Sequence, residues 1–91
     1  MTMSATVMAP LVYGGIPVFV DIENSFFCLD IKKVEKAITE KTKAILAVNL
    51  LGHPANLREL RSLADKNNIF LIEDAAQCPL ATEYGLSLIH I

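Results

Sequence analysis

The stretch IFLIEDAAQ, residues Ile69 to Gln77, decides how the rest of the chain is read. Its first four residues, 69–72, are apolar without polar alternation, which is typical of a strand buried on both faces of a parallel sheet in an α/β protein. Glu73 and Asp74 follow at the carboxyl end of this strand. Ligands of open parallel α/β sheets bind in the crevice beyond the carboxyl ends of the strands, so we expect the chemistry to centre on Asp74.

The preceding segments predict strands and helices in alternation. Residues 17–22 (PVFVDI) and 44–50 (AILAVNL) are rich in β-branched and other apolar residues and predict two further strands. Between them, Asp30 precedes IKKVEKAI, whose apolar residues recur at helical spacing, which predicts an N-capped amphipathic helix. A second amphipathic helix follows Asn56, which forms a pattern like a capping box with Glu59. Strand, helix, strand, helix, strand with short connections predicts an α/β fold with parallel pairing.

The amino-terminal residues predict a separate short helix. The segment 2–13, TMSATVMAPLVY, is mostly apolar and is followed by Gly14 and Gly15. Glycine just past the last helical residue is a common helix stop, and Pro10 would either kink the helix or confine it to the residues that follow.

Composition limits the classes of protein and partner that fit. The 91 residues carry a net charge of -2 and are 53% hydrophobic, with a mean hydropathy of +0.43. This apolar content is high for a small chain. It suggests that the chain is part of a larger protein and that some of its apolar surface contacts a neighbouring segment or subunit. Without a basic stripe we expect no nucleic-acid partner. No apolar run reaches about 18 residues and no signal-peptide pattern begins the chain, so we expect no membrane association and a cytoplasmic location.

Cys28 and Cys78 lack close-spaced partners, which indicates plain thiols rather than metal ligands or a disulfide framework.

Three segments together resemble a known family. They are PVFVDI (17–22), AITEKTKAILAVNLLGHPANL (37–57) and NIFLIEDAAQ (68–77), and they resemble the DegT/DnrJ/StrS-type sugar aminotransferases, pyridoxal-phosphate enzymes of the aspartate aminotransferase fold. The resemblance implies a partial three-layer sandwich with a mostly parallel sheet, part of the large domain of a fold-type I enzyme. Residues 1–82 would form the central part of that cofactor-binding domain, and 83–91 would be a divergent tail foreign to the family.

The resemblance also implies roles for individual residues. Asp74 would accept a hydrogen bond from the protonated pyridine nitrogen of pyridoxal 5'-phosphate, which keeps the ring an electron sink; from the residues alone, Asp74 could instead cap a helix beginning at 75–77. Gln77 would be a second cofactor contact, or else a surface glutamine. Met3 stands where many members stack an aromatic side chain on the ring, and a thioether can also lie against that face. Glu73 points to the other side and is interpreted as structural.

The implied function is the transfer of an amino group, with glutamate as the expected donor, to a nucleotide-linked keto sugar by a homodimeric enzyme. That chemistry needs a lysine that binds the cofactor covalently. All six lysines fall on polar helix faces or turns, so we expect this chain to lack the catalytic lysine and to be inactive alone. The alternatives are a sugar dehydratase of the same family and a non-catalytic remnant that serves as a binding or dimerisation module. A nicotinamide dehydrogenase does not fit, since no G-x-G-x-x-G follows any predicted strand.

Overall fold

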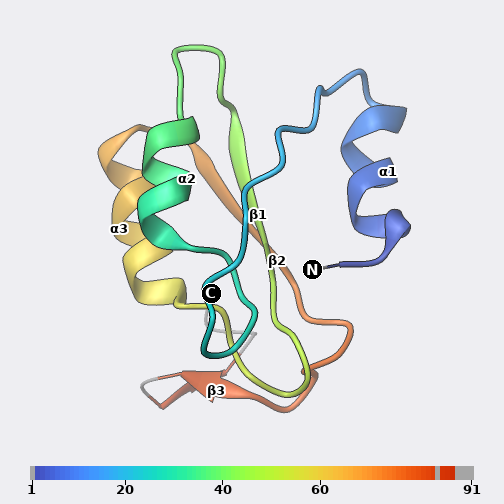
Figure 1. The fold of residues 1–91 in the computed structure, drawn as a ribbon, viewed down its shortest axis with the longest axis vertical. Coiled ribbons are helices and arrows are strands. Elements are labelled where there is room, and N and C mark those ends of the chain that lie inside the picture. The colour runs from blue at the N-terminus through green and yellow to red at the C-terminus, as the bar shows by residue number, and fades with distance from the viewer. Residues whose placement is uncertain (1, 84, 88–91) are drawn as a thin grey trace.

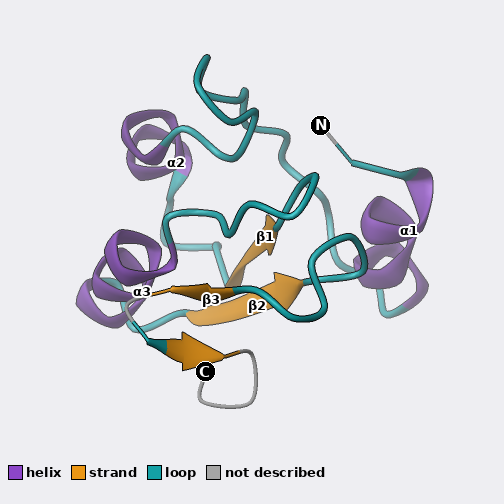
Figure 2. Cartoon of the chain, turned by 90° about the horizontal axis from the view of Figure 1, so that it is seen from below, coloured by secondary structure: helices purple, strands orange, loops and turns teal. Residues whose placement is uncertain are grey.

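The computed structural model describes residues 2–83 and 85–87, and it places helices on both sides of a small parallel sheet (Figure 1). The helices and strands are, in chain order, α1 (Ser4–Val12), α2 (Ile31–Ala37), β1 (Ala44–Val48), α3 (Leu57–Lys66), β2 (Phe70–Asp74), β3 (Thr82–Glu83) and β4 (Leu86–Ser87). α2 and α3 lie on one side of the β1–β2 sheet and α1 lies on the other, as the view from below also shows (Figure 2). The predicted α/β class and the partial three-layer arrangement are confirmed.

β1 and β2 pair in parallel, as the alternating pattern predicted. Their register runs from Ala44 opposite Phe70 to Val48 opposite Asp74. Backbone hydrogen bonds extend the ladder past both ends, from the Phe70 N–H to the Lys43 carbonyl (3.0 Å) and from the Asn49 N–H to the Asp74 carbonyl (2.9 Å). β2 therefore continues through the two acidic residues, two positions further than the apolar run indicated.

The core lies between the sheet and the two helices α2 and α3. In β1 the side chains of Ile45 and Ala47 point into it, and in α3 the face that carries Leu60 is fully buried. This matches the apolar stripe predicted for α3, because residues three and four apart share one helix face. The buried residues of this cluster are Cys28, Val34, Ile45, Ala47, Ala55, Leu57, Leu60, Leu63 and Ala64.

Two helix ends follow the sequence signals closely. The Asp30 carboxylate accepts hydrogen bonds from the backbone N–H groups of Lys32 (3.0 Å) and Lys33 (3.4 Å), which confirms the predicted cap of α2. At the end of α1, Gly14 adopts a φ of 79° and the Gly15 N–H donates to the Pro10 carbonyl (2.9 Å). This is the hydrogen-bond pattern of a Schellman motif, and it confirms the predicted glycine stop while Pro10 stays inside the helix.

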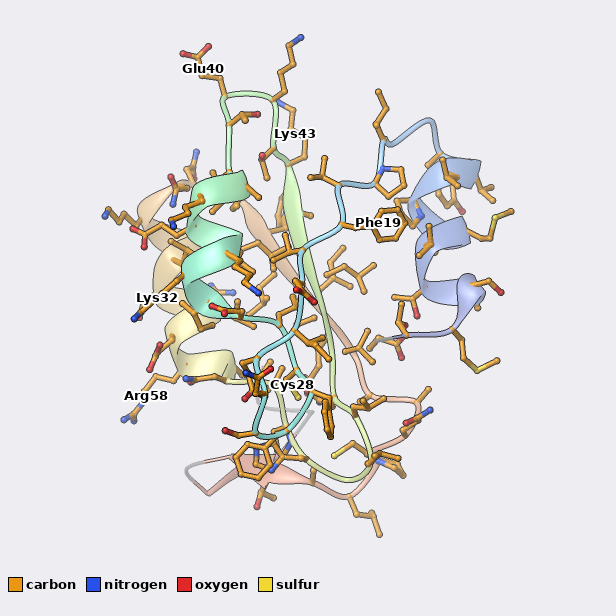
Figure 3. All side chains as sticks on the ribbon, in the orientation of Figure 1. Phe19, Cys28, Lys32, Glu40, Lys43 and Arg58 are labelled. Carbon is orange, nitrogen blue, oxygen red and sulfur yellow. The ribbon has the colours of Figure 1, made fainter. Side chains whose placement is uncertain are left out.

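The prediction of a strand over residues 17–22 is wrong. Within the described residues this segment forms only an isolated antiparallel bridge between Ile22 and Leu29. The physical reason is that neither of the described sheets includes this segment. Two bonds flank the bridge, from the Asp30 N–H to the Asp21 carbonyl (3.2 Å) and from the Glu23 N–H to the Cys28 carbonyl (2.9 Å), and they join the end of the segment only to the turn that follows it. Phe19 extends from this segment toward α1 and is exposed (Figure 3).

Two smaller predictions are also wrong. Asn56 makes no side-chain cap hydrogen bond, because its ψ of 74° departs from the extended backbone that brings a cap side chain to the first helical N–H groups. The strand around 69–72 is not buried on both faces, since the Phe70 side chain is 77% exposed and that of Ile72 is 49% exposed. These two residues face α1, which itself has no buried residue.

The tail predicted to diverge over 83–91 lies partly outside the described residues, namely at 84 and 88–91. Its described part takes part in a short antiparallel hairpin of β3 and β4. Within the part of the chain that is described, none of the helices combines the length and the apolar character that crossing a bilayer requires.

Candidate functional site

The carboxyl ends of β1 and β2 lie side by side and place Asp74 at the edge of the sheet. Asp74 is the last residue of β2 and pairs with Val48, the last residue of β1. In open parallel sheets the crevice beyond this edge binds ligands, because the loops that leave the strands diverge there. Asp74 therefore lies at the edge of the sheet where the sequence predicted a ligand-facing acid.

Strand alternation separates the two neighbouring carboxylates. Successive side chains of a strand point to opposite faces, so Glu73 shares the helix-covered face with Ala47, and Asp74 shares the other face with Val48. On the covered face, the Asn49 side-chain amide donates to the Glu73 carboxylate, and the Asn49 Oδ1 accepts from the Ala55 N–H at 2.8 Å. Asn49 is fully buried, and these bonds satisfy its amide. Glu73 thus holds the loop after β1 in place, which agrees with the structural role predicted for it.

Both oxygens of the Asp74 carboxylate are held by donors from different segments. The Thr6 hydroxyl of α1 donates to Oδ2 at 2.7 Å, and the backbone N–H of Ala76 donates to Oδ1 at 3.2 Å. The Thr6 hydroxyl in turn accepts a hydrogen bond from the Thr2 hydroxyl at 2.6 Å. Residues 75–77 form a turn rather than a helix, so the alternative role of Asp74 as a helix cap is wrong.

This carboxylate fits the pyridine nitrogen of the cofactor that the resemblance implies. An ionised carboxylate offers about four acceptor sites, and the two observed donors leave capacity for a further N–H. A protonated ring nitrogen is such a donor, and a hydrogen bond between opposite charges is stronger than a neutral one. Asp74 is half-buried and orientated by two fixed donors, so its remaining lone pairs are presented in a defined direction.

The other two predicted cofactor contacts lie on the segments that flank Asp74. Gln77 is exposed in the turn after β2, and its Oε1 accepts a long hydrogen bond (3.4 Å) from the Leu51 N–H in the loop after β1. Met3 is the N-cap residue of α1, one turn before Thr6, and its side chain is 69% exposed. α1 is joined to Asp74 through Thr6, and the Gln77 turn is joined to the neighbouring loop through Leu51.

Sequence reasoning missed two residues of this region. Asn49 had a signal, since a polar residue inside a predicted buried strand requires a hydrogen-bond partner. Thr6 had none, because its partner is 68 positions away in the chain. Only the packing of α1 beside the sheet end reveals that contact.

A surface hollow of about 750 Å³ lies away from Asp74. It is lined by the turn 23–32 and the segment 53–59, and beside it the rings of Phe26 and His53 stack with centroids 3.8 Å apart. Burial raises the pKa of the Cys28 thiol on its wall. Among the described residues, no group of three or more His, Cys, Asp or Glu is placed to hold a metal ion. Asp74 is not among the residues that line this hollow.

The chain matches the model of the DegT/DnrJ/EryC1/StrS aminotransferase family over residues 1–86. It is 42% identical to the 3-oxo-glucose-6-phosphate:glutamate aminotransferase of Bacillus subtilis, over 92% of this chain and 19% of that protein. The structure resembles that of DesV from S. venezuelae in complex with a ketimine intermediate, with a TM-score of 0.82, 44% identity and coverage of 85% of this chain and 21% of that one.

A dehydratase structure is similar as well. It is that of GDP-4-keto-6-deoxymannose-3-dehydratase with a trapped PLP-glutamate geminal diamine, at a TM-score of 0.86 and 36% identity, covering 93% of this chain and 22% of that one. The chain thus spans about a fifth of the length of the relatives it matches.

Proposed function

The chain belongs to the DegT/DnrJ/EryC1/StrS aminotransferase family, and we propose that it forms the central part of the cofactor domain of an enzyme that aminates a nucleotide-linked keto sugar. The observation that carries this proposal is the Asp74 carboxylate at the carboxyl edge of the parallel sheet, held by Thr6 and Ala76. The names of the relatives support the reaction class, since the Bacillus subtilis protein is a sugar-phosphate:glutamate aminotransferase.

The residues of this chain would bind and orient pyridoxal 5'-phosphate. When bound, this cofactor withdraws electrons from the α-carbon of the amino acid, which makes its proton removable. Asp74 would accept the hydrogen bond of the protonated ring nitrogen and keep that nitrogen charged. Gln77, in the adjoining turn, would be a second contact to the cofactor, and the Met3 thioether would lie against its ring.

In the proposed reaction, glutamate and the keto sugar give 2-oxoglutarate and the amino sugar, so that the amino group and the keto oxygen exchange places.

The catalytic lysine would come from a part of the enzyme outside this chain. The six lysines support this, because all are exposed and lie on α2, at the end of α3 or in the loop before β1. That loop is at the opposite end of the strands from Asp74, and Figure 3 shows Lys43 there and Lys32 on the outer side of α2. The 91-residue chain alone would therefore be inactive, and the complete enzyme would be a cytoplasmic homodimer.

A sugar dehydratase is the second candidate. It is favoured by the similarity to GDP-4-keto-6-deoxymannose-3-dehydratase, which covers 93% of this chain at 36% identity. Both reactions would use the same Asp74 contact, so the described residues are compatible with either.

The test uses the complete enzyme that carries this chain, with glutamate labelled with ¹⁵N at the amino group and nucleotide-linked keto sugars as acceptors. Retention of ¹⁵N in the sugar product, read by mass spectrometry, supports the aminotransferase, whereas a sugar that has lost a hydroxyl and holds no ¹⁵N supports the dehydratase.

We expect Asp74→Asn to lower kcat/KM by about 100-fold or more, because it removes a charge that stabilises the transition state. The matched control is Asp65→Asn on the exposed face of α3, which should change kcat/KM little. Equal rates for the two variants would contradict the proposal.

A further inference from the structure

We propose that Thr6 is a positioning residue, which orients the Asp74 carboxylate toward the cofactor ring; this inference rests on the proposed function. The Thr6 Oγ1 lies 2.7 Å from the Asp74 Oδ2, in a partly buried contact between α1 and the end of β2. A carboxylate is an acceptor only, so the hydroxyl must donate. The Thr6 proton is thus committed to Asp74.

A second hydroxyl fixes the direction of this bond. Thr6 Oγ1 also accepts from the Thr2 Oγ1 at 2.6 Å, which gives a chain of two hydroxyls that ends on the carboxylate. Hydrogen bonds in such a chain polarise one another and become stronger together. With its acceptor side occupied by Thr2, the Thr6 hydroxyl has Asp74 as the partner for its one proton.

The two donors to Asp74 come from different segments of the chain. Ala76 lies in the turn that follows Asp74 and donates to Oδ1, while Thr6 lies in a helix 68 residues earlier and donates to Oδ2. Either bond alone would restrain rotation of the carboxylate about its Cβ–Cγ axis less than the two bonds together. Both together define its plane and therefore the direction in which it can accept the ring N–H.

A purely structural role for the same contact predicts different results. On this alternative, the Thr6 bond only attaches α1 to the sheet, because α1 has no buried residue that would hold it there. In that case, loss of the hydroxyl would lower stability and leave the ring nitrogen undisturbed. The two roles are separated by comparing Thr6→Val, which keeps the shape and removes the hydroxyl, with Thr6→Ser, which keeps the hydroxyl.

The first measurement uses the complete enzyme without cofactor. In its NMR spectrum, the Ala76 amide resonance should move in Thr6→Val, because the carboxylate that it contacts can turn, and should stay near the wild-type position in Thr6→Ser. Ser62→Ala, on the exposed face of α3, is the control and should leave the resonance unchanged. An Ala76 resonance that is the same in Thr6→Val and wild type would overturn the inference.

The second measurement adds pyridoxal 5'-phosphate labelled with ¹⁵N in the ring. Thr6→Val should shift the ring ¹⁵N resonance toward that of the unprotonated pyridine and weaken cofactor affinity by about tenfold, which is the low end for the loss of a hydrogen bond to a charged group. Thr6→Ser should restore both. A Thr6→Val variant with a lowered unfolding temperature and an unchanged ring resonance would show a structural role only and would overturn the inference.

The outcomes keep this inference apart from the proposed function. A wild-type enzyme that does not bind the cofactor would sink the proposed function, whereas the Ala76 resonance would still report whether Thr6 positions the carboxylate. A wild-type enzyme that transaminates, together with a Thr6→Val variant whose ring nitrogen, affinity and kcat are unchanged, would sink the role of Thr6 alone.

Discussion

The two faces of the β1–β2 sheet are built from the same strands and have opposite environments. On the face toward α2 and α3, Ile45 and Ala47 are buried. On the face toward α1, Phe70 and Ile72 remain largely exposed, although their residue types are as apolar. The difference teaches that strand composition sets which residues can be buried, while the helices that pack on each face decide which of them are.

The same division separates the two acids at the end of β2. Glu73 belongs to the covered face, where the buried amide of Asn49 binds it. Asp74 belongs to the open face, where Thr6 of α1 reaches it. Parallel sheets are normally covered on both faces. We therefore expect the open face to be the one that receives the cofactor at its edge and further protein over its apolar residues.

The largest test of this comparison removes one large side chain from each face. Leu60→Ala should lower the free energy of unfolding by about 2–5 kcal/mol, because it leaves a cavity where the side chain is fully buried. Ile72→Ala should cost only about 1 kcal/mol, since half of that side chain is already in water. Urea unfolding of the 91-residue chain, followed by circular dichroism, measures both. Equal losses would show that the open face is packed in solution.

A smaller effect is expected from the buried amide on the covered face. Asn49→Ala should cost about 1–3 kcal/mol, because the Glu73 carboxylate and the Ala55 N–H lose their partner inside the protein. Asn67→Ala is the matched control: its side-chain N–H donates to the Leu63 carbonyl at 2.9 Å from an exposed position, and its loss should cost about 0.5–1 kcal/mol. The comparison would break down if both variants unfolded at the same urea concentration.

The smallest effect concerns the turn that closes the covered face. Burial pushes the pKa of Glu23 upward, but hydrogen bonds from the N–H groups of Ser25, Phe26 and Cys28 outweigh it and hold the pKa below its ordinary value of 4.5. A carboxyl whose pKa is lower in the folded state contributes stability above its unfolded pKa, and the contribution is lost as the pH falls through the folded value.

Glu23→Gln should therefore lower stability at pH 7 and make it less dependent on pH below 4.5. The measurement is the unfolding temperature between pH 7 and pH 3. Glu40→Gln, in the exposed turn before β1 (Figure 3), is the control, and identical pH profiles for the two variants would argue against the role of Glu23.

Local signals predicted α2, α3, β1 and the position of Asp74, because periodicity, caps and apolar runs act over a few residues. The segment 17–22 failed for the opposite reason: its composition suits a strand, but a strand exists only with a neighbour, and its last residues bond to the turn that follows. The carboxylate partners of Thr6 and Asn49 were equally out of reach, since they are 68 and 24 positions away. The family resemblance supplied the cofactor, which no local pattern contains.

The adjacency of Glu73 and Asp74 makes the site sensitive to chain length within β2. Because side chains alternate, one residue inserted or lost within β2 before this pair would exchange the two acids, sending the ligand-facing one into the core and the structural one out toward α1. After such an exchange the shorter side chain of Asp74 would stand where the Glu73 carboxylate now accepts from the buried Asn49 amide. The number of residues in β2 thereby determines which of the two carboxylates is available to the cofactor.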